Sequence, residues 1–548
     1  VGGMTVTATG APSGEGDRST AFVAGGFVGR ANSVDVTDAH VTNLKYVTAA
    51  NESGYAGGFV GVSQTGGLAE VSDDTSLKAL ISAGSLLGAV KYLIPSYLYT
   101  DVSFVDGGYV QADIAGGYAG DLTSGKVNDD PGTGDAEKAQ SYEKTQASPY
   151  AVYNIDHVAG SRYAGGFGGR VVSGGLAGSE DSGGLSILGG LSGVSISAND
   201  LLSIIDAYVP LVSYAGVSSQ LAGTTDATTD DGFTVSATTV DVSDGDAGTA
   251  GGFIGYAAGA QVSNSDVTRL RHTGVTEPSD LEVADAPSYF NGTSSYAVTG
   301  ATHAGGYVGL LDVGDAASIG GGLKVLGKAL VLDYVLSALS VVVSTIEHSD
   351  VEGTIGGFAV LASGTAVSGA VGNAGGFAGE IRGGHIQDSN SYNFSYVIGQ
   401  ETAGGYVGEL EPGDVANVLE STNILKGLLT ASGSLASVAQ DFVPTIRNSE
   451  TTSIPCGGAV RAQAASDAST LRGVAGGYVG HNLGGHIWGN NTNKWKSEND
   501  ADGNYNGARR TATAERIRSV YGAEMAGGFT GFMEPADTAK TGSLSLLY

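Results

Sequence analysis

Three short stretches contain side chains whose types and spacing could carry chemistry, and the clearest is DADGN at 500–504. Asp500, Asp502 and Asn504 alternate around a glycine there, which is how the oxygen ligands of a calcium loop begin. The glutamate that closes such a loop is not clearly placed, so a solvated acidic loop is the favoured alternative. Calcium is thus the one candidate cofactor, with Asp500, Asp502 and Asn504 as its candidate ligands.

A second stretch, GLKVLGKA at 322–329, nearly matches a phosphate-binding loop. Ala329 stands where that loop needs a hydroxyl to hold magnesium, so we interpret the match as chance. The sequence contains neither H-E-x-x-H nor C-x-x-C. Its single cysteine, Cys456, excludes an internal disulfide and a cysteine-rich metal site.

A third stretch, GGHI, places His385 and His486 at the same position of a recurring frame. Other copies of the frame have Gln261 or Lys126 there, which indicates an exposed polar position and not a metal ligand. Acidic loops such as 228–231 supply carboxylates, but acid–base catalysis would need coils to bring them together. We therefore predict no catalytic residue and no enzyme, with a carbohydrate-active β-helix protein as the alternative.

Composition narrows the classes of partner. The formal net charge of −30 repels nucleic-acid backbones and anionic membrane surfaces, so we expect no nucleic acid to bind. The most apolar run, 323–343, contains Lys324, Lys328 and Asp333, so we expect no membrane insertion in this segment. Glycine supplies 91 residues, but 41% of the chain is apolar, which favours a folded core over disorder.

The chain is organised around one short string, A-G-G-[F/Y]-x-G, which occurs ten times. Adjacent glycines allow a tight corner, and the aromatic and the residue after it suit a strand. Short strands joined by glycine corners predict a parallel solenoid with the rings stacked in its interior. A surface platform of rings for carbohydrate is the alternative. The ten aromatic residues are Phe27, Phe59, Tyr118, Phe167, Phe253, Tyr307, Phe377, Tyr406, Tyr478 and Phe529.

Four apolar inserts divide the strings into pairs. We predict one continuous solenoid over 1–548 with five super-repeats, and we expect it to be a fragment of a longer array because both ends fall in mid-pattern. Apolar residues three and four apart, with Asn199 as one N-cap, predict helices in the inserts. These helices would pack on the flank of the solenoid or on a neighbouring chain. The super-repeats are approximately 1–100, 101–215, 216–344, 345–444 and 445–548, and the inserts lie near 76–95, 185–210, 323–343 and 419–444.

The predicted fold is therefore mainly β: a right-handed parallel β-solenoid, or β-helix, from which helical inserts project. At about 22 residues per coil outside the inserts, the chain would form roughly 18 coils and a rod of about 85 Å.

The full frame is most complete in AGGFAGEIRGGHIQDS and AGGYVGHNLGGHIWGN. It resembles the GLUG-type repeat of large bacterial surface proteins, although the long inserts depart from that pattern. The resemblance implies a β-helical, adhesin-like giant protein that is extracellular or attached to the cell surface.

We therefore expect a non-catalytic structural or adhesive stalk or fibre outside the cell. Its partners would be another copy of the chain, or a glycan or protein of a host or surface. The alternatives are a carbohydrate-binding or carbohydrate-active β-helix protein, and a filament that assembles through the helical inserts.

Overall fold

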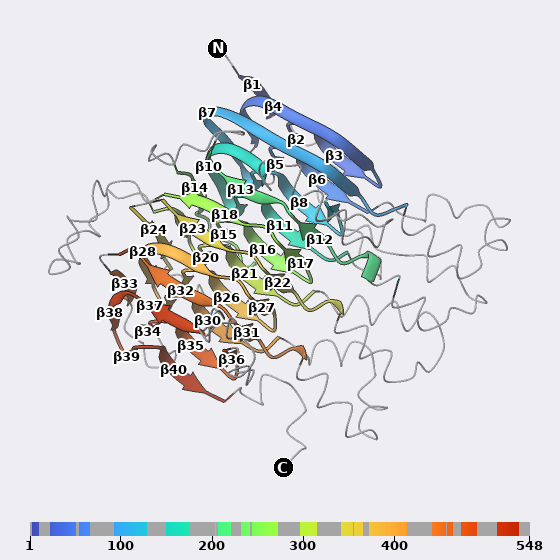
Figure 1. Ribbon diagram of the computed structural model, residues 1–548. Helices are drawn as coiled ribbons and strands as arrows, with labels where there is room; N and C mark the ends of the chain where they lie inside the picture. The colour runs from blue at the N-terminus through green and yellow to red at the C-terminus, as the bar shows by residue number, and fades with distance from the viewer. Residues whose placement is uncertain are drawn as a thin grey trace, which may run out of the picture.

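The fold is taken from a computed structural model of the chain (Figure 1). The structure describes residues 3–9, 22–50, 54–65, 92–128, 150–174, 203, 206–220, 232–241, 244–271, 296–314, 341–354, 356–364, 372–413, 441–455, 457–463, 473–489 and 512–535.

Two parallel β-sheets, stacked coil upon coil, make up the described chain (Figure 1). The smaller sheet contributes one five-residue strand to each coil: β3 (Val28–Asn32), β6 (Val60–Gln64), β8 (Ala119–Thr123), β11 (Gly168–Val172), β16 (Ile254–Ala258), β21 (Val308–Asp312), β26 (Ala378–Arg382), β30 (Val407–Glu411), β35 (Val479–Leu483) and β40 (Thr530–Glu534).

The larger sheet runs around the rest of the coil. Four of its strands are long enough to turn corners: β4 (Asp35–Ala49), β7 (Ser96–Gly116), β10 (Tyr150–Gly165) and β28 (Ser391–Gly399). The others are β1 (Met4–Ala8), β2 (Val23–Gly25), β5 (Tyr55–Gly57), β9 (Lys126–Val127), β12 (Leu211–Ser213), β13 (Gly216–Ser218), β14 (Thr234–Ala237), β15 (Thr249–Gly251), β17 (Gln261–Ser263), β18 (Val267–Leu270), β19 (Val298–Gly300), β20 (His303–Gly305), β22 (Thr345–Glu347), β23 (Val351–Gly353), β24 (Phe358–Ala362), β25 (Asn373–Gly375), β27 (His385–Gln387), β29 (Thr402–Gly404), β31 (Thr445–Arg447), β32 (Glu450–Ser453), β33 (Gly458–Ala462), β34 (Val474–Gly476), β36 (His486–Trp488), β37 (Thr513–Glu515), β38 (Ile517–Gly522) and β39 (Met525–Gly527).

Every coil follows the same path, as the sixth shows. A three-residue strand, β20, ends at the first glycine of a string, and the chain turns at the ring into β21 of the smaller sheet. β22, β23 and β24 complete the coil, and β25 then pairs with β20 to start the next one. We call the column of β20 and its equivalents the first face, the smaller sheet the second face, and the column of β22 and its equivalents the third face. The predicted parallel β-solenoid is confirmed.

The ten aromatic rings of the strings form one column inside the solenoid. Neighbouring ring centroids lie 4.8–5.0 Å apart with their planes nearly parallel. The eight inner rings are fully buried, while Phe27 and Phe529 at the two ends of the column are 51% and 40% exposed. Stacked pairs of this kind add about 0.5–1.5 kcal/mol each beyond the area they bury.

Both glycines of the string are required by close backbone approach. A Cβ on Gly57 would lie 1.9 Å from the carbonyl oxygen of Val60, across the turn. A Cβ on Gly58 would lie 2.0 Å from the carbonyl oxygen of Gly117, in the next coil. The first glycine therefore permits the tight turn, and the second permits the coil spacing.

A second type of corner follows the third face. In eight coils the residue after the third-face strand is not glycine but has a positive φ of 48–56°. Asparagine and aspartate tolerate this left-handed conformation better than other residues with a β-carbon. The eight residues are Asp38, Tyr99, Asn128, Tyr214, Asn264, His348, Asp388 and Asn448.

The predicted length of the rod was wrong. One coil corresponds to one string. The five coils without an insert span 29–54 residues from ring to ring, not the roughly 22 residues expected. The described chain therefore forms ten coils, and the ring column is about 44 Å long. Coils are longer than expected because much of the chain lies between their strands, largely in segments outside the described residues.

The four inserts lie largely outside the described residues, so their helical structure stays a prediction. The described chain stops after β6, β11, β21 and β30 and returns just before the third face, so all four inserts depart from the same corner in every second coil. Their last residues are described and anchor there through the buried side chains of Ile94, Tyr208, Val342 and Phe442. Among the described residues, no helix has the length and apolar character needed to span a membrane.

Candidate functional site

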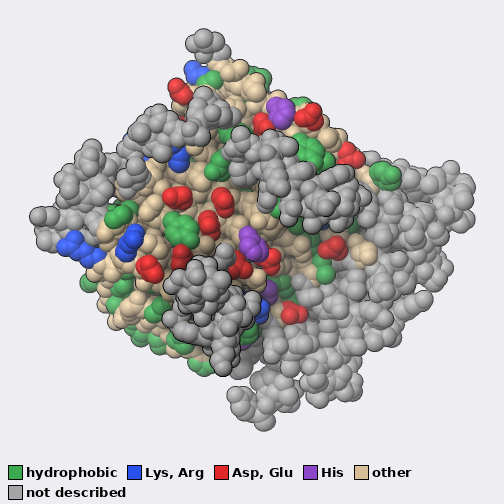
Figure 2. Space-filling view, in the orientation of Figure 1, with side chains coloured by type: hydrophobic (Ala, Val, Ile, Leu, Met, Phe, Trp, Pro, Cys, Tyr) green, Lys and Arg blue, Asp and Glu red, His purple; other side chains and the backbone are tan. Residues whose placement is uncertain are grey.

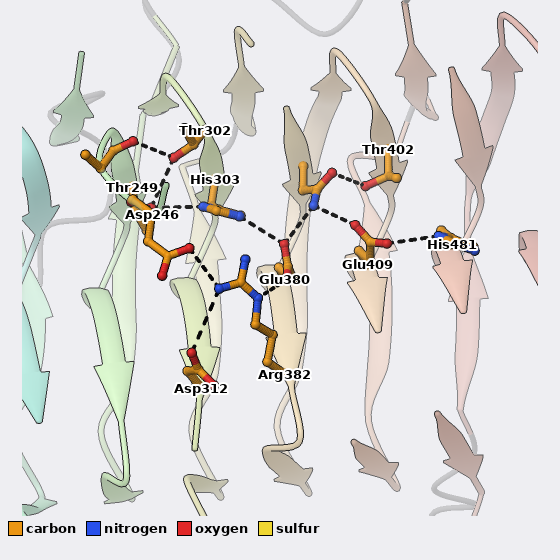
Figure 3. Close-up of polar contacts among 12 residues, drawn as sticks. Asp246, Thr249, Thr302, His303, Asp312, Glu380, Arg382, Thr402, Glu409 and His481 are labelled. Atoms are coloured by element: carbon orange, nitrogen blue, oxygen red, sulfur yellow. Dashed lines mark hydrogen bonds and ion pairs between the residues drawn. The ribbon is translucent and has the colours of Figure 1, made fainter. Parts of the chain in front are cut away.

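An extended set of interacting polar side chains lies between the first and second faces, in coils five to ten (Figure 3). Coils five to eight contribute the first residue of their first-face strand, such as Asn373 of β25. Coils seven to nine contribute the residue that follows the string, such as Glu380 of β26, and the tenth coil contributes the last residue of β40. We call this set the polar file; its members are Thr249, His303, Asn373, Glu380, Thr402, Glu409, His481 and Glu534.

The file begins with a fully buried histidine. His303 Nδ1 lies 3.0 Å from Thr249 Oγ1 in the preceding coil. His303 Nε2 lies 2.9 Å from Glu380 Oε2 in the following coil. One imidazole thus links three coils.

Asn373 continues the file. Its amide nitrogen donates to Glu380 Oε2 at 2.8 Å and to Glu409 Oε2 at 2.7 Å, while its oxygen accepts from Thr402 Oγ1 at 2.9 Å. The amide therefore separates two carboxylates that would otherwise repel each other in adjacent coils.

His481 ends the file between two further carboxylates. Its Nδ1 lies 2.9 Å from Glu409 Oε1, and its Nε2 lies 3.1 Å from Glu534 Oε1. Burial alone would lower the pKa of His481, but the two glutamates outweigh burial and raise it.

Arg382 lies beside the file and gathers three carboxylates. Its guanidinium donates to Glu380, donates to Asp246 Oδ1 at 2.8 Å, and lies 3.9 Å from Asp312 Oδ2 (Figure 3). Burial opposes ionisation of Glu380, but Arg382 and His303 outweigh it and hold the pKa of Glu380 well below its usual range. Burial raises the pKa of Asp312 to about 7, despite the guanidinium nearby.

In coils two to four, the positions equivalent to the polar file carry both apolar and charged side chains. Tyr55, Val62, Ile114 and Tyr163 form a small apolar cluster there. Next to it, Arg170 Nη1 lies 3.5 Å from Asp121 Oδ2 in the adjacent coil. In these coils the space between the two faces therefore holds both apolar contacts and a charge pair.

This arrangement is suited to joining coils, not to acid–base catalysis. A catalytic carboxylate must be free to contact a substrate, whereas Glu380 is 2% exposed and is held by Arg382, His303 and Asn373. Within the described ranges, no group of three or more His, Cys, Asp or Glu side chains has the geometry to hold a metal ion.

The other residues singled out by the sequence lie elsewhere. Asp500, Asp502 and Asn504, and the stretch 322–329, fall outside the described residues, so the calcium site stays a prediction. His385 and His486 lie on the third face, on the strands β27 and β36 and apart from the polar file.

Sequence reasoning missed the polar file because its members come from coils far apart in the chain; His303 and Glu380 are 77 residues apart. One signal was available. In six of the ten copies the residue directly after the string is charged or a histidine, and aligning the strings would have placed these residues in one row: Arg30, Asp121, Arg170, Glu380, Glu409 and His481.

Comparison of this chain with family models, with curated proteins and with solved structures finds no match. The resemblance to the GLUG-type repeat therefore rests on the string and its frame alone.

Proposed function

We propose that this chain is a shaft segment of an extracellular structural or adhesive stalk of a bacterial surface protein, and that it is not an enzyme. The observation that carries the proposal is the continuous stack of ten coils. In this stack the rings and the buried charges contact the next coil. Such a stack extends along one axis, which is the shape that a spacer requires.

Two further features support a shaft outside the cell. The chain has a net charge of −30, which favours solubility, and acidic side chains are spread over the described surface in Figure 2. The coils are stabilised by a hydrogen-bond ladder and ring stacking without any disulfide, since the chain has one cysteine. The GLUG-type resemblance supports the bacterial surface as the location.

Protease shaving of intact producing cells, followed by detection with an antibody against this segment, tests the location. We expect the segment to be removed from intact cells and to appear as a rod in electron micrographs of the purified chain. Recovery of the segment only from the cell interior would contradict the proposal. So would release of reducing sugars from polysaccharides by the purified chain.

A filament that assembles through the inserts is a second candidate, and the insert corner favours it. Departure at one corner in every second coil places successive inserts about 10 Å apart along a single line. A regular line of apolar segments is a surface on which a second chain could pack. Sedimentation velocity over a wide concentration range tests this: larger species should grow with concentration, and a monomer throughout would exclude the filament.

A further inference from the structure

A groove lies on the outer side of the third face and is lined by residues of β22, β27, β31 and β36. Figure 1 labels these four strands. The groove has a volume of about 360 Å³, within the range of small-molecule sites. Two rows of outward side chains line it. One row is Thr345, His385, Thr445 and His486, and the other is Glu347, Gln387, Arg447 and Trp488.

The second row changes character along the rod. In the two preceding coils the same position holds Ser213 and Ser263, whose hydroxyls contact each other at 3.0 Å. In the groove the same position is occupied by Glu347 and Gln387, and in the next two coils by the larger Arg447 and Trp488. A ladder with only a structural role would keep its serines, because their hydroxyls already hydrogen-bond to each other. The replacement by long planar polar side chains builds a concave polar surface at this place.

Trp488 is held in a fixed orientation at one end of the groove. The guanidinium carbon of Arg447 lies 4.6 Å from the centre of its ring, and the ring of His486 lies 5.9 Å away. Trp488 lies on the last described strand of the third face, and its indole is 50% exposed. A flat aromatic ring, held in place but still accessible, can pack against an apolar ligand face at little cost in side-chain entropy.

The remaining groups supply hydrogen bonds of both polarities. Arg447 donates, Glu347 accepts, and Gln387 does both. Burial, with help from Arg447, lowers the pKa of His385, so its ring is neutral at pH 7. Glu347 and Asp441 together outweigh the single positive charge of Arg447, so the groove does not favour an anion.

We propose that this groove binds a neutral, hydroxyl-rich ligand, namely one or two pyranose rings of an uncharged glycan. The CH face of a pyranose packs on the indole of Trp488. Its hydroxyls accept hydrogen bonds from Arg447 and donate them to Glu347. The shaft proposal needs no ligand, so the two proposals can fail independently.

Titration calorimetry with neutral tetrasaccharides in gluco, manno and galacto configuration, and with tetrasaccharides that contain uronic acids, tests the site. We expect saturable binding of at least one neutral probe. Trp488→Ala should weaken that binding about tenfold, which corresponds to the loss of one aromatic stack. Gln387→Ala is a second variant that removes one polar partner and leaves the ring.

Tyr521→Ala is the matched control. Tyr521 is 54% exposed and has the guanidinium of Arg461 5.1 Å from its ring centre, but it lies on β38, away from the groove. Its truncation should leave binding unchanged, and thermal melting would show that each variant is folded. The proposal is overturned if no neutral probe binds at millimolar concentration, if only the acidic probes bind, or if Trp488→Ala and Gln387→Ala both bind like the unaltered chain.

Discussion

Glu380 is buried between neighbouring coils and still carries its charge. It does so because Arg382, His303 and Asn373 surround the carboxylate with donors, each within hydrogen-bond reach. Removing one member of such a group would leave a buried charge without its partner, which is costly. The polar file therefore fixes the relative position of successive coils more strictly than apolar packing would.

Stability depends on pH through His481 of the polar file and through Asp312 beside the file. His481 has a raised pKa, so its contribution is present below the pKa of the unfolded chain and is lost as pH rises through the raised value. Asp312 has a pKa of about 7, so its contribution is likewise lost as pH rises through about 7. We expect the melting temperature to be higher at about pH 5.5 than at about pH 8.5.

His481→Gln should flatten this pH dependence, because glutamine keeps a donor and an acceptor but cannot be protonated. His486→Gln, on the exposed third face, is the control and should keep the slope of the unaltered chain. Equal slopes in the two variants would show that His481 does not carry the effect.

At the scale of single elements, the spacing between coils at the turn from the first to the second face depends on the second glycine of the string. Gly405→Ala would put a Cβ 2.1 Å from the carbonyl oxygen of Gly477, whereas Gly528, at the same position in the last described coil, has no heavy atom within 4 Å. We expect Gly405→Ala to lower the free energy of unfolding by at least about 2 kcal/mol. Gly528→Ala should change it by less than about 0.5 kcal/mol. Urea denaturation of both variants measures this, and similar losses would contradict the close approach.

The corner after the third face gives a reciprocal pair of substitutions. Tyr214 and Asn264 occupy the same corner in adjacent coils, with φ of 48° and 49°. Tyr214→Asn should stabilise the chain by about 1 kcal/mol, because asparagine tolerates the left-handed conformation. Asn264→Tyr should destabilise it by a similar amount. Effects of the same sign in denaturant melts would mean that side-chain packing, not backbone conformation, decides this corner.

At the scale of the whole molecule, most contacts of a coil are with its two neighbours, so damage should stay largely local. Phe253→Ala removes a fully buried ring from the middle of the column and should cost about 3–5 kcal/mol. Phe27→Ala removes a ring that is already half exposed and should cost less than half as much. Hydrogen exchange should quicken in β11, β16 and β21 in the first variant, and a uniform increase over all coils would contradict nearest-neighbour stability.

The repeat explains how much one sequence could predict. Two glycines and an aromatic residue recur in every coil, so they can be recognised in the sequence as a repeated string. Their repetition predicts parallel stacking of the coils. The number of coils was not predictable in this way, because segments of very different length separate the strands between strings. The polar file and the groove were missed for the opposite reason. Their residues differ from coil to coil, as Asn373 differs from His303 and Trp488 from Ser263, and only the register of the sheets brings them together.

The insert corner has a consequence for how such a chain can change its length. Because one unit of two coils always begins and ends at the same corner, a gene could gain or lose whole units by recombination without shifting any strand out of phase. A gain of a single coil would instead place two inserts in neighbouring turns, where they would compete for the same space. Natural size variants of this protein should therefore differ by even numbers of turns.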